Sequence, residues 1–468
     1  MANDPDGVEW RERIEAQLAA APGPADPVLV RETLAKGRGL TGLDTRDVAA
    51  LLAVSDPQLV EELFAAARHV KREVYGSRLV FFAPLYISNR CANECLYCAF
   101  RRGNSGLRRR NLSLDEIAAE TRAIVAQGHK RILLVAGEGA AGTRGLAFVR
   151  DAIRRIYDTK VGPGEVRRVN VNIAPLTGDG FRALHSTGIG TYQLFQETYH
   201  PEAYRRFHTA GPKADYGWRL SAMDRAMAAG INDVGIGALF GLHHWRYEVL
   251  ALIEHAAHLE RRFGVGPHTI SVPRLEPAEG SACSSAPPHA VSDADFLKIV
   301  AILRLAVPYT GIIMSTRESA ALRRQTFQLG VSQISAGSRT DPGGYGRAAA
   351  QRAFGSQFQL GDHRSLDEVV RDVVNMGFLP SFCTACYRLG RTGRDFMDLA
   401  KPGEIKTHCN PNALSTCLEY LLDYASPATR AMGEQLIETK AAAMPAGIRA
   451  VCQRLTRAIR RGQRDVLV

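Results

Sequence analysis

Three cysteines lie close together in the segment CANECLYCAF: Cys91, Cys95 and Cys98. Thiolates are the usual ligands of iron–sulfur clusters, and three at this spacing can hold one face of a cuboidal four-iron, four-sulfur cluster. One iron is then left without a protein ligand and can bind a chelating small molecule. A structural zinc site is the alternative, but such sites have four ligands in closed sets, and the sequence offers no obvious fourth ligand nearby.

A second set of cysteines lies near the C-terminus. Cys383 and Cys386 form a CxxC pair, and Cys409 follows after 22 further residues. Three thiolates again leave one position open. His408 could complete a Cys3His zinc site, so the residues alone leave both zinc and a second iron–sulfur cluster possible. Cys417 and Cys452 are expected to be small buried hydrophobic residues.

The composition is that of a globular protein with a sizeable core. The chain has 468 residues, of which 46% are hydrophobic and 7% aromatic. Its nine cysteines are an odd number, and six fall in the two sets, which favours metal binding in a reducing compartment over disulfides. No run of about 18 apolar residues occurs, and the sequence MANDPDGVEWRERIEAQ contains no apolar region typical of a signal peptide. We therefore expect a cytoplasmic protein without a membrane partner.

The net charge of +11 raises the question of nucleic-acid binding. The arginines are spread along the chain, with local clusters at Arg101–Arg102, at Arg108–Arg110 and in RLTRAIRRGQR near the C-terminus. None of these clusters is interleaved with aromatic residues. A basic solvated surface explains the same composition, so we expect no nucleic-acid partner.

The pattern of elements predicts an α/β fold, a (βα)8 TIM barrel. Residues 1–77 read as a helical extension, and residues 78–340 alternate short apolar strands with amphipathic helices, as in a parallel barrel. Residues 341–468 begin with a long polar loop and continue as a helical domain that carries the second cysteine set. In this fold reactive groups lie at the C-terminal mouth, so we expect all candidate residues there. The eight expected strands span 79–88, 131–137, 168–176, 191–198, 233–242, 269–277, 311–316 and 331–338.

The first cysteine motif, with Tyr97 before its last cysteine, resembles the signature of the radical S-adenosylmethionine (SAM) superfamily. The resemblance implies that the open iron holds the amino and carboxylate groups of SAM, and that cluster reduction cleaves SAM to a 5′-deoxyadenosyl radical. It also implies a radical SAM type of barrel.

Polar residues at predicted strand ends are candidates for binding SAM. Gly137 and Glu138 end the second strand, where a glycine lets the backbone approach a ligand; they resemble the segment that receives the methionyl amine. Asn172 ends the third strand, and Gln196 and Glu197 end the fourth; they could bind ribose hydroxyls or the SAM carboxylate region. Taken singly, each is equally explained as an ordinary turn or polar strand end.

The combination of CxxxCxxC with a C-terminal CxxCx22C resembles the HydG family, radical SAM tyrosine lyases that help to build the active-site cluster of FeFe-hydrogenase. The resemblance covers roughly residues 80–430 and includes the segments GIGTYQLFQETYH, VGPHTISVPR, STRES and QFQLGDHRSLDEV. It implies cleavage of the Cα–Cβ bond of tyrosine to p-cresol and dehydroglycine, and then formation of CO and cyanide on an auxiliary 4Fe–4S cluster that carries an extra iron. It also implies other hydrogenase maturation proteins and an external reductant as partners.

The same resemblance assigns further residues. His268 in VGPHTISVPR matches the ligand of the extra iron, although a histidine at a strand entry can also be satisfied by backbone. Arg317 in STRES ends the seventh strand, where a guanidinium can bind the substrate carboxylate through two parallel hydrogen bonds. Ser315, Ser335 and Ser338 are weaker substrate-binding candidates, and Arg339 is equally explained as a structural surface residue.

One segment departs from the family. The loop after the second strand reads GEGAAGTRG, whereas the family commonly has a histidine and a proline after the Gly-Glu pair. Two other functions therefore stay open: a radical SAM lyase of another aromatic amino acid, and an iron–sulfur carrier or scaffold that donates its C-terminal cluster.

Overall fold

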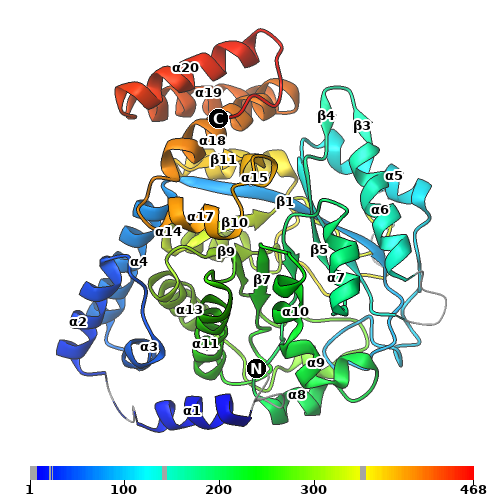
Figure 1. The fold of residues 1–468 in the computed structure, drawn as a ribbon, viewed down its shortest axis with the longest axis vertical. Coiled ribbons are helices and arrows are strands. Elements are labelled where there is room, and N and C mark those ends of the chain that lie inside the picture. The colour runs from blue at the N-terminus through cyan, green and yellow to red at the C-terminus, as the bar shows by residue number, and fades with distance from the viewer. Residues whose placement is uncertain (1–7, 21–22, 24, 140–144, 348–354) are drawn as a thin grey trace.

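The computed structural model describes residues 8–20, 23, 25–139, 145–347 and 355–468. Four helices come first: α1 (Val8–Ala19), α2 (Pro27–Arg38), α3 (Thr45–Leu52) and α4 (Pro57–Tyr75). Aspartate side chains cap the last three by accepting from first-turn amides. Helix α4 packs against the barrel helices α13 (Asp293–Ala306) and α14 (Ala320–Leu329), so the predicted helical extension covers one side of the barrel (Figure 1).

Eight parallel strands form a closed barrel, as predicted. Neighbouring strands pair in chain order, and β10 pairs with β1 to close the ring. The strands are β1 (Arg78–Ser88), β2 (Arg131–Ala136), β5 (Arg168–Asn172), β6 (Tyr192–Gln193), β7 (Val234–Gly237), β8 (Thr269–Ser271), β9 (Gly311–Met314) and β10 (Val331–Ser335). Several strands are shorter than expected, because the apolar run in the sequence continues past the end of the strand into a loop. Strand β8, for example, ends at Ser271, two residues before Pro273.

The helices between the strands cover the outside of the barrel. They are α5 (Leu114–Ala126), α6 (Leu146–Asp158), α7 (Gly178–His185), α8 (Pro201–Phe207), α9 (Tyr216–Leu220), α10 (Ala222–Ala228), α11 (Trp245–Phe263) and α12 (Ala282–Ser285), with α13 and α14. A 3-10 turn (Pro212–Ala214) and a short antiparallel pair, β3 (Lys160–Val161) with β4 (Gly164–Glu165), lie in the connections. None of the described helices is both long and apolar enough to cross a membrane.

The C-terminal part contains one strand that the sequence did not predict. Its elements are α15 (Leu366–Asn375), β11 (Leu379–Ser381), α16 (Ala385–Arg388), α17 (Gly393–Ala400), α18 (Lys406–Asp423), α19 (Pro427–Ala442) and α20 (Ala446–Arg460). Strand β11 pairs in parallel with the first residues of β1, from Arg78 to Val80. This pairing attaches the C-terminal helices to the N-terminal end of the barrel, where α18, α19 and α20 stack (Figure 1).

The buried cysteines of the C-terminal helices agree with their predicted role. Cys417 in α18 and Cys452 in α20 are both almost fully buried in the apolar core. The domain boundaries at 77 and 340 stay predictions, and the segment from Gly355 to Asp362 returns to the barrel mouth rather than joining the helices.

Candidate functional site

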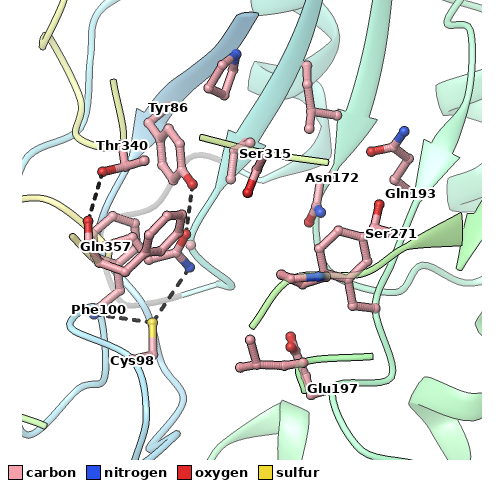
Figure 2. A pocket seen from close by; sticks show the side chains of 18 of the residues that line it. Tyr86, Cys98, Phe100, Asn172, Gln193, Glu197, Ser271, Ser315, Thr340 and Gln357 are labelled. Atoms are coloured by element: carbon pink, nitrogen blue, oxygen red, sulfur yellow. Dashed lines mark hydrogen bonds between the residues drawn. The ribbon is translucent and has the colours of Figure 1, made fainter. Parts of the chain in front are cut away.

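A large cavity occupies the C-terminal mouth of the barrel. Its empty space, with the open mouth included, is about 1520 Å³. The three cysteines of the loop after β1 line it, as expected. Figure 2 shows part of the wall, to which several strands contribute Tyr86, Asn172, Gln193, Ser271 and Ser315.

Nitrogen donors point at the sulfur atoms of this loop. The Asn93 side chain lies 3.6 Å from Cys91 Sγ, and the backbone N–H of Phe100 lies 3.4 Å from Cys98 Sγ. Burial raises the pKa of Cys95 to about 12 and also raises the pKa of Cys98. The half-buried thiols of Cys91 and Cys98, with donors aimed at them, fit thiolates that bind metal, because a metal deprotonates its thiol ligands outright.

The end of β2 packs directly against the cysteine loop. A Cβ atom on Gly137 would lie 2.3 Å from the carbonyl oxygen of Arg90 and 3.4 Å from Cβ of Cys91, so only glycine fits there. The Glu138 backbone oxygen accepts from the N–H of Ala92 at 2.8 Å. Residues 140–144 of the divergent loop lie outside the described residues.

Glu197 lies on the cavity wall in an unusual conformation. Its φ angle is 73°, which a residue other than glycine rarely adopts and which occurs most often at functional sites. Its carboxylate contacts Lys213 Nζ at 2.6 Å and Arg219 at 3.4 Å. Burial alone would raise its pKa, but these two cations lower the pKa overall, so the carboxylate is charged.

The other predicted SAM residues divide into two groups. Asn172, Gly137, Glu138 and Tyr97 line the cavity, and the Tyr97 hydroxyl is fixed by the Nε2 atom of His208 at 2.9 Å. Gln196 is buried but is not among the residues that line the cavity. Gln193 lines it instead, a residue that the sequence reasoning missed although it lies in the same predicted strand.

Arg317 lies in the wall of the cavity with its charge available. Its guanidinium lies 3.3 Å above the centre of the Phe358 ring, and it makes no ion pair within the described ranges. The predicted serines also line the cavity. Ser315 and Ser335 accept from backbone N–H groups at 3.3 and 3.1 Å, whereas the buried Ser338 hydroxyl has no hydrogen-bond partner among the described residues. Arg339 does not line the cavity, and one of its guanidinium nitrogens donates to the Ser338 carbonyl.

Two residues of the loop after β10 complete the cavity and were not predicted. The Gln357 side chain accepts from the Tyr86 hydroxyl at 2.8 Å and lies 3.7 Å from Cys98 Sγ (Figure 2). Phe358 forms the surface under Arg317. Both lie in a segment of the chain that pattern alone identifies only as a loop.

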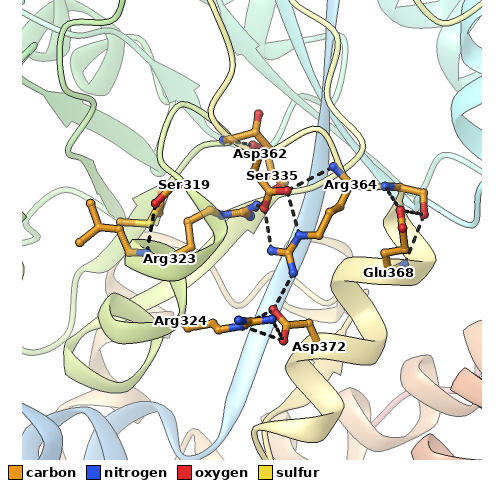
Figure 3. Close-up of polar contacts among 12 residues, drawn as sticks. Ser319, Arg323, Arg324, Ser335, Asp362, Arg364, Glu368 and Asp372 are labelled. Atoms are coloured by element: carbon orange, nitrogen blue, oxygen red, sulfur yellow. Dashed lines mark hydrogen bonds and ion pairs between the residues drawn. The ribbon is translucent and has the colours of Figure 1, made fainter. Parts of the chain in front are cut away.

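A buried ion network fixes this loop. Asp362 accepts from Arg323 and from Arg364, whose guanidinium also contacts Asp372 at 2.7 Å (Figure 3). The N–H groups of Gly361 and Asp362 donate to the carbonyl oxygen of Thr316. The loop that carries Gln357 is therefore tied to the segment that follows β9.

The second cysteine set lies at the opposite mouth of the barrel, which corrects the expectation that all candidates meet at the C-terminal mouth. Cys383, Cys386, Cys409 and His268 line a separate cavity of about 620 Å³. Its other lining residues include Arg78, Arg131 and Gly311, each the first residue of a strand. The reason is the pairing of β11 with the start of β1, which brings the chain to this end just before Cys383. His408 is not among the lining residues.

His268 lines this second cavity at the entry of β8. Its Nδ1 atom is buried without a hydrogen-bond partner in the described part of the chain and lies 3.8 Å from the Asp233 carboxylate. Its ring packs edge-on against Tyr387 and Phe396, with centroid distances of 5.8 and 5.1 Å. A carboxylate beside one ring nitrogen is also found at metal-binding histidines, where that nitrogen donates a hydrogen bond to it.

Within the described part of the chain, no three His, Cys, Asp or Glu side chains are placed to hold a single metal ion. A tetrahedral zinc ion draws all its sulfur ligands to about 2.3 Å from one point. In a cuboidal cluster each iron binds its own cysteine, so the three sulfur ligands need not converge on one point.

Comparison with known proteins agrees with this geometry. The family model of the radical SAM superfamily matches residues 85–256, and that of the biotin and thiamin synthesis associated domain matches residues 271–379. The 2-iminoacetate synthase of Escherichia coli (strain K12) is 31% identical over 349 residues, which are 74% of this chain and 89% of that protein.

Two solved structures are more similar. A crystal structure of HydG, described as a maturase of the [FeFe]-hydrogenase, superposes with a TM-score of 0.94 at 45% identity, over 98% of this chain and 99% of that one. HydG from Carboxydothermus hydrogenoformans has a TM-score of 0.83 at 42% identity, over 97% and 99% of the two chains. The chain belongs to the HydG family of radical SAM proteins.

Proposed function

We propose that the protein is a radical SAM tyrosine lyase of FeFe-hydrogenase maturation. It cleaves the Cα–Cβ bond of tyrosine to p-cresol and dehydroglycine, and converts the latter to CO and cyanide for the hydrogenase. The observation that carries this proposal is the pair of three-cysteine sites at opposite mouths of one barrel, each lining its own cavity. Its partners are then other maturation proteins and an external reductant.

The first cavity has the groups that SAM and an amino acid require. Cys91, Cys95 and Cys98 would hold a 4Fe–4S cluster, which, when bound and reduced, supplies the electron that cleaves SAM to a 5′-deoxyadenosyl radical. Glu138 and Asn172 line this cavity, where they would accept from the amine and hydroxyl groups of SAM.

Arg317 is the group for the substrate carboxylate. Its guanidinium is partly buried, stacks on Phe358 and makes no ion pair among the described residues. It can therefore bind a carboxylate through two parallel hydrogen bonds without breaking another ion pair. The free hydroxyl of Ser338 lies on the same wall. These two side chains would hold tyrosine so that its amino group faces the SAM site.

The second cavity has the groups for the auxiliary cluster. Cys383, Cys386 and Cys409 would hold the cluster, and His268 the extra iron. Arg78 and Arg131 line the same space without an ion pair among the described residues. Their positive charges favour anionic molecules there, such as a carboxylate fragment or cyanide.

The test is anaerobic turnover. The protein is reconstituted with iron and sulfide and given SAM, tyrosine and dithionite, and p-cresol, CO and cyanide are measured. A Cys386→Ala variant is expected to make p-cresol without CO. Cys452→Ala is the matched control, because that cysteine is buried in α20 and lines neither cavity; it is expected to make all three products.

The same assay separates the alternatives. SAM cleavage without p-cresol would contradict tyrosine as the substrate and favour a lyase of another aromatic amino acid, for which Arg317 would serve equally. Transfer of iron to an acceptor protein without consumption of SAM or amino acid would favour the carrier function.

A further inference from the structure

The loop that carries the first cysteine set is strongly basic. Residues 89–112 contain six arginines and one carboxylate, Glu94, a net charge of +5. Arg101 pairs with Glu94 at 2.7 Å, and Arg110 pairs with Glu116 at 2.6 Å. Arg102 is exposed and makes no ion pair with any described residue, and its backbone N–H donates to Asn93 inside the loop.

The fold brings two further arginines to the same place. Arg205 and Arg206 lie in the last turn of α8, both exposed and without an ion pair in the described ranges. The carbonyl oxygen of the next residue, Phe207, accepts from the N–H of Leu96 at 3.0 Å, so the end of α8 lies beside the cysteine loop. These residues are far apart in the sequence, and only the folded chain places them together.

Leu96 lies beside the end of α8, next to these arginines. It is 36% exposed and one of four large hydrophobic side chains that are exposed within the described residues. It lies between Cys95, which is only 5% exposed, and Tyr97. Its carbonyl oxygen accepts from the Ser281 hydroxyl at 2.7 Å, which holds the loop in place. We call Leu96, Arg102, Arg205 and Arg206 the Leu96 patch.

Nearby carboxylates do not neutralise the patch. Glu94 is occupied by Arg101 and by the N–H of Gly103. Glu202 on α8 is paired with Arg11 at 2.8 Å. Glu279 is exposed on the neighbouring loop and makes no ion pair with a described residue, so it offsets one charge of the three arginines of the patch.

We propose that the Leu96 patch is the docking surface for a small acidic protein that carries one electron. This rests on the proposed function, in which each SAM cleavage needs one electron at Cys91–Cys98; the carrier is oxidised by one electron and the cluster is reduced by one. An exposed apolar side chain within a charged rim is the usual anatomy of an interface, and redox encounters use small ones. Opposite charge speeds the encounter. Because Leu96 adjoins Cys95, a carrier seated there is one residue from a cluster ligand.

The experiment uses the reconstituted enzyme and a reduced flavodoxin as the acidic one-electron carrier. The rate of cluster reduction is followed by absorbance at about 50 mM and about 0.5 M salt, since high salt screens surface charge. Arg205→Glu/Arg206→Glu is expected to lower the low-salt rate by about tenfold and to lose most of its salt dependence. Arg449→Glu/Arg454→Glu on α20 reverses two exposed charges far from the patch and is expected to behave as the parent protein.

Two further measurements keep the outcome clear. Binding of oxidised flavodoxin to the metal-free protein, measured by calorimetry, should weaken in the α8 variant and in Arg102→Glu alone. Turnover driven by dithionite, which needs no protein carrier, should be equal in all variants. Whether the enzyme turns over tyrosine with dithionite at all tests the proposed function separately from the docking surface. The proposal would be overturned if flavodoxin reduced both patch variants at the rate of the parent protein, or if the α20 variant lost as much of that rate as the α8 variant. It would also be overturned if duplex DNA bound the patch more tightly and displaced flavodoxin.

Discussion

The ion pair between Asp362 and Arg323 should contribute more to the free energy of unfolding than any exposed ion pair of the protein. Its side chain is 1% exposed, and its partner Arg323 is fully buried (Figure 3). Asp362→Asn keeps the shape and removes the charge, which leaves the Arg323 guanidinium buried without a counter-ion. Loss of one partner from such a pair costs about 3–5 kcal/mol.

Arg364→Ala is the matched comparison. Arg364 also binds Asp362, but it is 22% exposed, and Asp372 keeps a second partner in Arg324 when Arg364 is removed. A partly exposed pair contributes about 1 kcal/mol or less. The two variants therefore remove different partners from one network and should differ by at least about 2 kcal/mol.

The assay is urea unfolding at neutral pH together with amide hydrogen exchange. The backbone amides of Gly361 and of position 362 donate to the Thr316 carbonyl. In Asp362→Asn both amides should exchange faster, because the loop loses its anchor. A loss below about 1 kcal/mol, or a loss no larger than that of Arg364→Ala, would refute the assignment of the network as the anchor of the loop.

The free energy that Asp362 contributes to folding should also depend on pH, in a direction set by the shift of its pKa. Burial alone would raise the pKa of Asp362, but Arg364 and Arg323 lower it to about 2, from an ordinary value of 3.8. The lower folded pKa stabilises the protein above the ordinary value, and this contribution, about 2 kcal/mol, is lost as the pH falls from 3.8 towards about 2. Asp362→Asn should lack this part of the acid sensitivity.

Three further predictions concern the two cavities. Gly137→Ala should prevent iron binding by the first cysteine set while the second set still binds iron, because the new Cβ meets the Arg90 carbonyl at 2.3 Å; full iron content by elemental analysis would contradict this. Arg317→Gln should raise the KM for tyrosine by about tenfold or more, because the substrate carboxylate loses a pair of charged hydrogen bonds, while SAM is still cleaved. An unchanged KM would contradict a role of Arg317 in substrate binding. His268→Ala should keep p-cresol formation but abolish CO and lower the iron content of the second site, and undiminished CO would exclude its role as an iron ligand.

The sequence was sufficient for the barrel and for the first cysteine site. Strands alternate with helices along the chain, and a loop that directly follows a parallel strand must open at the C-terminal mouth. Cys91, Cys95 and Cys98 therefore lie where they were expected. These predictions depend only on local patterns and on the topology that such patterns impose.

The features that the sequence did not predict depend on contacts between segments that are far apart in the chain. Strand β11 has three residues, one of them a proline, and no alternating pattern; its pairing with β1 decides which mouth receives Cys383. Gln196 was expected at the cavity because it ends the fourth predicted strand together with Glu197, but of these two only Glu197, whose φ is positive, lines the cavity. Gln357 meets Cys98 across 259 residues of sequence, and no local signal marks such a contact.

The pairing of β1 also bears on how a second site can be added to a barrel that is already complete. A closed barrel offers no free edge, but β1 has 11 residues, and β2 pairs with it only from Ala83 onward. The first residues of β1 thus keep an open edge on that side, which β11 fills. A tail that follows the last barrel strand can therefore be joined by three residues of backbone pairing, and the loops at the other mouth of the barrel are left as they are. In such an arrangement a second cavity is formed by an addition to the chain rather than by a change within the barrel.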